Sequence, residues 1–151
     1  MNQSTTSTTS PQLVLQAVYL KDCSFEAPIG PRVTGEWNPH ISLDLNTAVN
    51  PVEGDLREIV LTVTVSAQQD DRTIFLIEVK QAGAFLMQNF GEEDFKRAAS
   101  VICPGVLFPY VRSTVSNLVS QGGFPQLLLP PVNFEALFAG SNEDLTNVTR
   151  N

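Results

Sequence analysis

The stretch Ala98–Gly140 reads AASVICPGVLFPYVRSTVSNLVSQGGFPQLLLPPVNFEALFAG and carries only two charges, Arg112 and Glu135. The whole chain is 17% charged, so this composition is not that of an ordinary solvated surface. Prolines and glycines interrupt the stretch too often for a membrane-spanning helix. Part of its apolar surface must therefore be buried by the rest of the fold, by another subunit or by an apolar ligand.

The first half of this stretch has the periodicity of a helix. Apolar residues recur every three or four positions up to Gly122-Gly123, a typical helix end; they are Val106, Leu107, Val111, Val115, Leu118 and Val119. Pro104 is expected to separate this helix from an earlier one that opens at Glu92. The opposite face is small and uncharged, and we interpret it as a subunit interface rather than a merely polar exposed face; it includes Ser113, Ser116, Asn117 and Ser120.

The second half of the stretch predicts an extended segment and a short last helix. Pro125, Pro130 and Pro131 cannot donate backbone hydrogen bonds and favour an extended chain. Asn133 fits the N-cap of a helix. The apolar residues that follow, Phe134, Leu137 and Phe138, line one side of that helix. They are either ordinary core residues or the wall of an apolar groove.

The upstream sequence alternates as β-strands do. Three segments with short polar turns between them predict an antiparallel meander; they are His40–Asn46, Ile59–Ser66 and Thr73–Gln81. A first strand, 13–26, is followed by the Pro- and Gly-rich residues 27–39, which predict a long crossover that brings it beside a later strand. Both faces of this first strand are apolar, which favours pairing across a subunit boundary. Residues 83–91 are expected to form a loop or a ragged strand end.

One face of the predicted sheet combines acidic and apolar residues. Period-two counting places Ile74, Leu76, Glu78 and Lys80 outward, with Asp22, Ser24 and Glu26 on one side of the first strand. Such a face suits a basic, partly apolar partner. Ordinary solvating carboxylates are the alternative interpretation.

Bulk composition excludes several function classes. The formal charge is −7, and the nine basic residues are not clustered, which argues against nucleic acid as a partner. Cys23 and Cys103 have no metal or redox spacing. The Ser/Thr-rich residues 1–11 lack the features of a signal peptide and are expected to be disordered. We expect one domain over residues 12–140, a flexible tail over 141–151 and a cytosolic location.

Catalytic motifs do not emerge from the sequence. The single histidine, His40, has no nucleophile near it in sequence, and no phosphate-binding or metal-binding pattern occurs. We therefore expect a binding protein without metal or cofactor. A small oligomeric enzyme or small-molecule binder is the competing class, for which the polar candidates are His40, Tyr19, Tyr110 and Arg112. A purely structural oligomer is a third interpretation.

Several segments resemble the SecB family of bacterial protein-export chaperones. The resemblance covers residues 12–139 in order and rests on five segments: KDCSFEAP (Lys21–Pro28), WNPHISLDLNTA (Trp37–Ala48), FLIEVKQAGAF (Phe75–Phe85), CPGVLFPYVR (Cys103–Arg112) and GGFPQLLLPPVNFEALF (Gly122–Phe138). It implies an α+β fold, with a four-stranded antiparallel sheet, a long crossover after strand 1, one long C-terminal helix and a short last helix. It also implies a homotetramer, built as a dimer of dimers.

The resemblance further implies a function and its sites. Such a chaperone holds unfolded preproteins in the cytosol without ATP or membrane insertion and passes them to SecA. SecA would dock on Asp22, Glu26, Leu76 and Glu78. Clients would occupy apolar grooves near Trp37, Phe134, Leu137 and Phe138, and the small polar helix face at Ser113, Ser116, Asn117 and Ser120 would lie in the tetramer interface.

Overall fold

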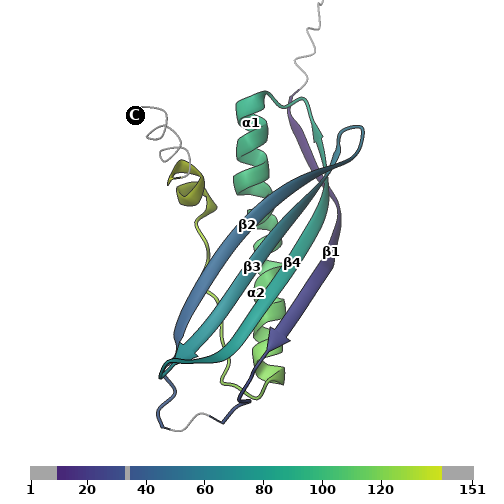
Figure 1. Ribbon diagram of the computed structural model, residues 1–151. Helices are drawn as coiled ribbons and strands as arrows, with labels where there is room; N and C mark the ends of the chain where they lie inside the picture. The colour runs from purple at the N-terminus through teal and green to yellow at the C-terminus, as the bar shows by residue number, and fades with distance from the viewer. Residues whose placement is uncertain (1–9, 33–34, 141–151) are drawn as a thin grey trace, which may run out of the picture.

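The computed structural model describes residues 10–32 and 35–140. Its elements are β1 (Gln12–Glu26), β2 (His40–Glu53), β3 (Leu56–Gln69), β4 (Arg72–Gln88), α1 (Glu92–Arg97), the π-helical turn η1 (Ala98–Ile102) and α2 (Cys103–Gln121). Residues 134–140 form a last helix. In Figure 1 the long twisted sheet forms one layer and the helices lie against one of its faces. The predictions for residues 1–9 and for the tail concern segments outside the described residues.

The sheet has the strand order β1-β4-β3-β2, and every neighbouring pair is antiparallel. Gln69 pairs with Arg72, so Asp70 and Asp71 alone make the β3–β4 turn, with φ of 55° and 60°. Aspartate tolerates this left-handed conformation, which two-residue hairpin turns require. The crossover through residues 27–39 brings β1 beside β4 as an edge strand. The predicted α+β architecture is confirmed.

The core lies between α2 and the inner face of the sheet. Leu107, Val111, Val115 and Val119 are fully buried, as the helical spacing predicts. They belong to one cluster with inward residues of the central strands β3 and β4, including Ile59, Leu61, Val63, Ile77 and Val79. The prediction that Val106 joins this face is wrong. Val106 is 36% exposed because it lies about 100° around the helix from Leu107.

The predicted disturbance near Pro104 is a π-helical turn between α1 and α2, and the helical path runs on through the proline. In η1 the N–H of Cys103 donates to the carbonyl of Ala98, five residues back, so the turn contains one extra residue. This π-helical turn directly precedes Pro104, which has no N–H to donate to a regular helix. By length and composition the helical path Glu92–Gln121 could span a membrane. One of its faces instead belongs to the core, which accounts for its apolar character.

All three strands of the predicted meander are longer than the sequence predicts. β4 continues through the expected loop to Gln88, with Phe85 and Met87 directed inward and buried. Gly83 does not end the strand: a Cβ there would lie 2.7 Å from the Phe85 ring and 3.0 Å from Leu107, so the missing side chain allows α2 to approach the sheet. β2 runs past its expected turn through Pro51, which an edge strand tolerates.

Candidate functional site

A groove opens between the edge strand β2 and the last helix. Its cavity has a volume of about 240 Å³ and is lined by Leu45, Asn46, Thr47, Ser100, Phe134, Leu137 and Phe138. The groove exists because α2 packs along β3 and β4 and leaves the inward side chains of β2 only partly covered. We call this cavity and its lining the β2 groove.

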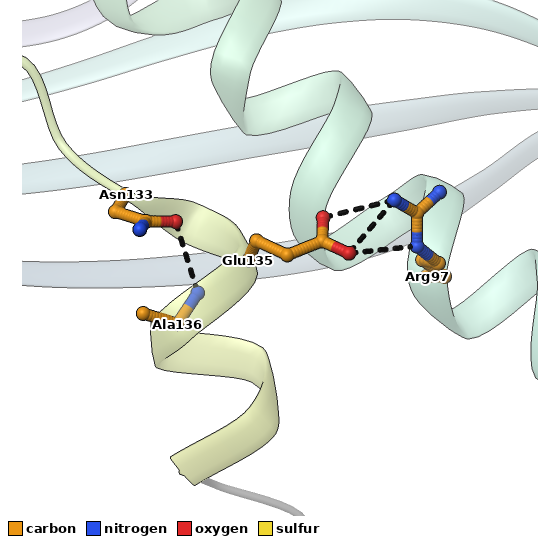
Figure 2. A network of polar contacts seen from close by, with 4 residues as sticks. All are labelled: Arg97, Asn133, Glu135 and Ala136. Carbon is orange, nitrogen blue, oxygen red and sulfur yellow. Dashed lines mark hydrogen bonds and ion pairs between the residues drawn. The ribbon is translucent and has the colours of Figure 1, made fainter.

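The last helix begins at a side-chain cap and is held beside the β2 groove by an ion pair and an aromatic contact. The Asn133 Oδ1 atom accepts a hydrogen bond from the Ala136 N–H at 3.0 Å, which confirms the predicted N-cap. The Arg97 guanidinium binds the Glu135 carboxylate through Nη2 to both oxygens, at 2.8 and 2.9 Å, and through Nε at 3.2 Å (Figure 2). The Phe134 ring packs edge-on against Phe108, with 6.0 Å between centroids. Only Phe134 of this helix is buried.

The structure brings three of the four predicted groove residues together. Phe134, Leu137 and Phe138 line the β2 groove, and Leu137 is 52% exposed. Trp37 is not in its lining. It stacks on Phe124 at 5.7 Å, next to an aromatic cluster with Phe25 and Phe75, and stays partly exposed.

The contributions of β2 and Ser100 to the groove were not predicted from the sequence. The alternation in β2 predicted which side chains point inward. It carried no signal that α2 would leave them uncovered.

The outer face of the sheet gathers the predicted docking residues. The β1–β4 register places Glu26 opposite Leu76 and Ser24 opposite Glu78. Asp22, Ser24 and Glu26 are alternate residues of β1 and point outward together. Asp22 and Glu26 are exposed, Leu76 is 37% exposed and Glu78 is partly buried. Ile74, also predicted outward, is buried, because the register shift between β3 and β4 after Ala67 turns it inward.

The exposed face of α2 has two halves. Ser113, Asn117 and Ser120 are exposed and Ser116 is partly exposed, so the predicted interface residues are accessible in the single chain. One to three turns earlier, Ile102, Val106 and Tyr110 form an exposed apolar stripe, with 41%, 36% and 48% of their surfaces accessible. The sequence analysis did not identify this stripe.

Reactive groups do not converge in the described part of the chain. Burial raises the pKa of the Cys103 thiol to about 12, and burial together with the neighbouring Asp22 raises the pKa of Cys23. Such thiols are poor nucleophiles at neutral pH. Within residues 10–32 and 35–140, no three His, Cys, Asp or Glu side chains are grouped so that they could hold a metal ion.

The polar residues of the competing enzyme interpretation are also dispersed. Tyr19 binds Glu58 on the outer face of the sheet, whereas Arg112 lies over the Phe108 ring, 5.6 Å from its centroid. Tyr110 is exposed on α2, and His40 is exposed at the start of β2. A sheet-edge groove with apolar residues in its lining and an acidic outer face are the features expected of a binding protein of the chaperone class.

Comparison with known proteins identifies the family. The family profile described as "Preprotein translocase subunit SecB" matches residues 6–144. "Protein-export protein SecB" of Pseudomonas paraeruginosa is 49% identical over 131 residues, which cover 85% of this chain and 80% of that protein. The protein of the same name from Pseudomonas syringae pv. tomato is 46% identical over 130 residues, covering 85% and 79% of the two chains. This chain belongs to the SecB family.

A solved structure shares the fold at much lower identity. The Mycobacterium tuberculosis Rv1957 SecB-like chaperone, in complex with a ChAD peptide from the HigA1 antitoxin, superimposes with a TM-score of 0.66 at 17% identity. The match covers 80% of this chain and 88% of that one.

Family membership confirms the predicted function. The protein is a cytoplasmic, non-enzymatic chaperone of protein export that delivers preproteins to SecA.

Proposed function

We propose that this chaperone holds unfolded preproteins in the β2 groove, docks SecA on the outer face of its sheet, and assembles as a dimer of dimers. The β2 groove is the observation that carries this proposal. It lies along a free strand edge, is open to solvent, and combines the apolar residues Leu45, Phe134, Leu137 and Phe138 with the polar residues Asn46, Thr47 and Ser100.

The groove suits many different client sequences. An edge strand offers unpaired backbone N–H and C=O groups, which recognise an extended chain whatever its side chains are. Leu137 and Phe138 add adaptable apolar contacts. Trp37 forms a second, separate patch at the crossover, so a long client would contact both regions and gain affinity by avidity.

SecA docking is supported by the grouping of Asp22, Glu26, Leu76 and Glu78 on one face of two neighbouring strands. Three carboxylates around an exposed leucine fit a basic partner with an apolar anchor. This face lies on the opposite side of the sheet from the helices. A client in the groove and SecA on the sheet would therefore not compete for the same surface.

Assembly is supported by two further surfaces. β1 is a free edge with exposed Val14, Leu15 and Leu20, which favours strand pairing with a second chain. The stripe of Ile102, Val106 and Tyr110, continued by the small residues Ser113 and Asn117, favours close packing of two α2 helices. Two different surfaces of this kind produce a dimer of dimers.

The test of holding uses the purified full chain without nucleotide and an unfolded preprotein that aggregates on its own. Suppressed aggregation is expected, from a particle whose mass by light scattering is four times the 16.5 kDa of one chain. A well-folded oligomer that leaves aggregation unchanged would contradict the proposal.

The test of assembly is Asn117→Arg, which places a long charged side chain on the proposed α2 interface. The mass is expected to halve. Asp44→Arg, on the exposed outer face of β2, serves as the matched control and should leave the mass unchanged. An Asn117→Arg protein of unchanged mass would refute the α2 interface.

A further inference from the structure

A charged network on the outer face of the sheet has Glu58 of β3 at its centre. Lys21 Nζ of β1 lies 2.7 Å from Glu58 Oε1, and the Asn50 side-chain amide of β2 donates to the same oxygen at 3.0 Å. The Tyr19 hydroxyl of β1 donates to Oε2. We call these four residues the Glu58 network. It connects three strands, and both carboxylate oxygens are occupied.

Small residues on β4 make this network possible. Glu58 pairs with Ala84, and Tyr19 pairs with Ala82, so the side chains that join β1 to β3 pass over two alanines. Ala82 is fully buried beneath them. The register shift between Leu20 and Asp22 leaves Lys21 without a partner on β4. A bulge of this kind re-aims a side chain, and here Lys21 reaches Glu58.

The network neutralises Lys21 locally. The Glu58 side chain is only 13% exposed. Hydrogen bonds from Lys21, then Tyr19, then Asn50 lower its pKa to about 2. Burial, followed by the bond to Glu58, raises the pKa of Tyr19 to about 12, so the phenol remains a donor. Glu58 is therefore an anion at neutral pH, and it holds the ammonium group of Lys21.

Asp22 is the chain neighbour of Lys21 and a proposed SecA contact. Both residues line one depression of about 420 Å³ on the outer face, together with Lys80, the register partner of Asp22. Yet none of the ion pairs among the described residues joins Asp22 to Lys21 or Lys80. If Glu58 carried no charge, the carboxylate closest to Lys21 in the sequence would be that of Asp22.

We infer that Glu58 is a positioning residue for SecA docking: it holds Lys21 away from Asp22, so that Asp22 faces the partner unpaired. This inference rests on the proposed docking face. Glu58 itself is covered by its three donors and does not need to touch SecA. Its effect is carried by the position of one neighbouring cation.

The experiment measures SecA binding to the full-length protein at low and high salt for Glu58→Gln, Lys21→Gln and the double variant. Glu58→Gln removes the anion and keeps the side-chain shape. It is expected to weaken binding about threefold to fivefold at low salt, the scale of a surface ion pair, and the loss should vanish near 1 M salt, where charges are screened. The double variant should bind like Lys21→Gln alone, because the Lys21 ammonium, which Glu58 would otherwise hold away from Asp22, is absent from both proteins.

A purely structural role for Glu58 predicts a different pattern, since the double variant would then bind as weakly as Glu58→Gln. That outcome, or unchanged binding by Glu58→Gln, would overturn the inference. Asp44→Asn, which removes an exposed outer-face charge without releasing Lys21, is the matched control and should bind as wild type does. Suppression of client aggregation by each variant verifies that it is folded.

The variant Asp22→Asn distinguishes a wrong role for Glu58 from a wrong docking face. If it weakens SecA binding while Glu58→Gln does not, only the role of Glu58 is wrong. If Asp22→Asn binds as wild type does, the docking face itself is wrong, and the positioning role is wrong with it.

Discussion

Two carboxylate–cation pairs hold two different regions of this chaperone, and they are built differently. On the outer face of the sheet, Glu58 is 13% exposed and accepts hydrogen bonds from three side chains on two other strands. On the last helix beside the β2 groove, Glu135 is 56% exposed and pairs with Arg97, which is 49% exposed; among the described residues neither side chain has another hydrogen-bond partner. The first pair is part of a covered network, whereas the second is a solvated bridge to a short helix.

This difference matches the role that we propose for each surface. A folded partner such as SecA selects a fixed arrangement of charges, so a rigid sheet with its cations held in place lowers the cost of docking. Unfolded clients differ from one another, and a wall that shifts at little cost can adapt to them. The last helix, with one buried aromatic and one exposed ion pair, has the few contacts expected of such a wall.

We expect the strongest loss of binding from a substitution on the outer face of the sheet. Leu76→Arg places a cation among Asp22, Glu26 and Glu78, against a basic partner, and like charges brought together in an interface cost several kcal/mol. We expect SecA binding to weaken about 100-fold, the equivalent of about 3 kcal/mol. Suppression of client aggregation should be unchanged. Equal loss of both activities would mean that the two surfaces are not independent.

A second substitution should affect the β2 groove and leave the outer face unchanged. Phe134→Ala removes the one buried side chain of the last helix, and burial of a phenylalanine is worth about 3 kcal/mol. Hydrogen exchange over residues 134–140 should accelerate and client binding should weaken, while SecA binding stays as in wild type. Leu128→Ala, at a side chain that is 65% exposed in the extended segment, is the matched control. Unchanged exchange in Phe134→Ala would show that other contacts hold this helix.

The two regions also differ in how much the sequence reveals. Strict alternation in β2, β3 and β4 predicted the outer and inner faces, and it placed Leu76 and Glu78 outward. Their grouping with Asp22 and Glu26 also depends on the pairing of β1 with β4, which alternation alone does not give. Ile74 was misplaced because a register shift has no signal in that period. Lys21 and Glu58 lie far apart in sequence, so their contact required the crossover of β1 to be known.

The groove could not be predicted to the same extent. Leu45 and Ser100 line the groove only because α2 packs over β3 and β4 and leaves β2 uncovered. This arrangement depends on how the elements pack together, and the sequence pattern carries no signal for it. A disturbance of the helix near Pro104 was predicted, and a π-helical turn at 98–102 accommodates the proline. The N-cap role of Asn133 was predicted correctly, because a helix cap depends on local sequence.

A smaller effect is expected on the pH dependence of stability. The folded-state pKa of Glu58 is about 2, below the ordinary value of 4.5, so its network contributes stability above about pH 4.5 that is lost as the pH falls toward 2. Glu58→Gln should therefore lower the melting temperature at pH 7 by about 3 °C, and this difference should shrink steadily below pH 4.5. Asp44→Asn should show no such trend. A pH-independent difference would mean that the stability comes from packing and not from the ionised carboxylate.

The smallest expected effect tests the solvated bridge. Exposed ion pairs contribute up to about 1 kcal/mol, so Glu135→Gln should change client affinity by only about twofold and leave SecA binding untouched. The charge-swapped protein, Arg97→Glu with Glu135→Arg, should regain wild-type client binding, because both partners are half exposed and either orientation is solvated. A tenfold loss that the swap does not repair would mean that Glu135 or Arg97 contacts the client itself. The ion pair would then be a direct part of the client site, and its role as a mere support for the last helix would be wrong.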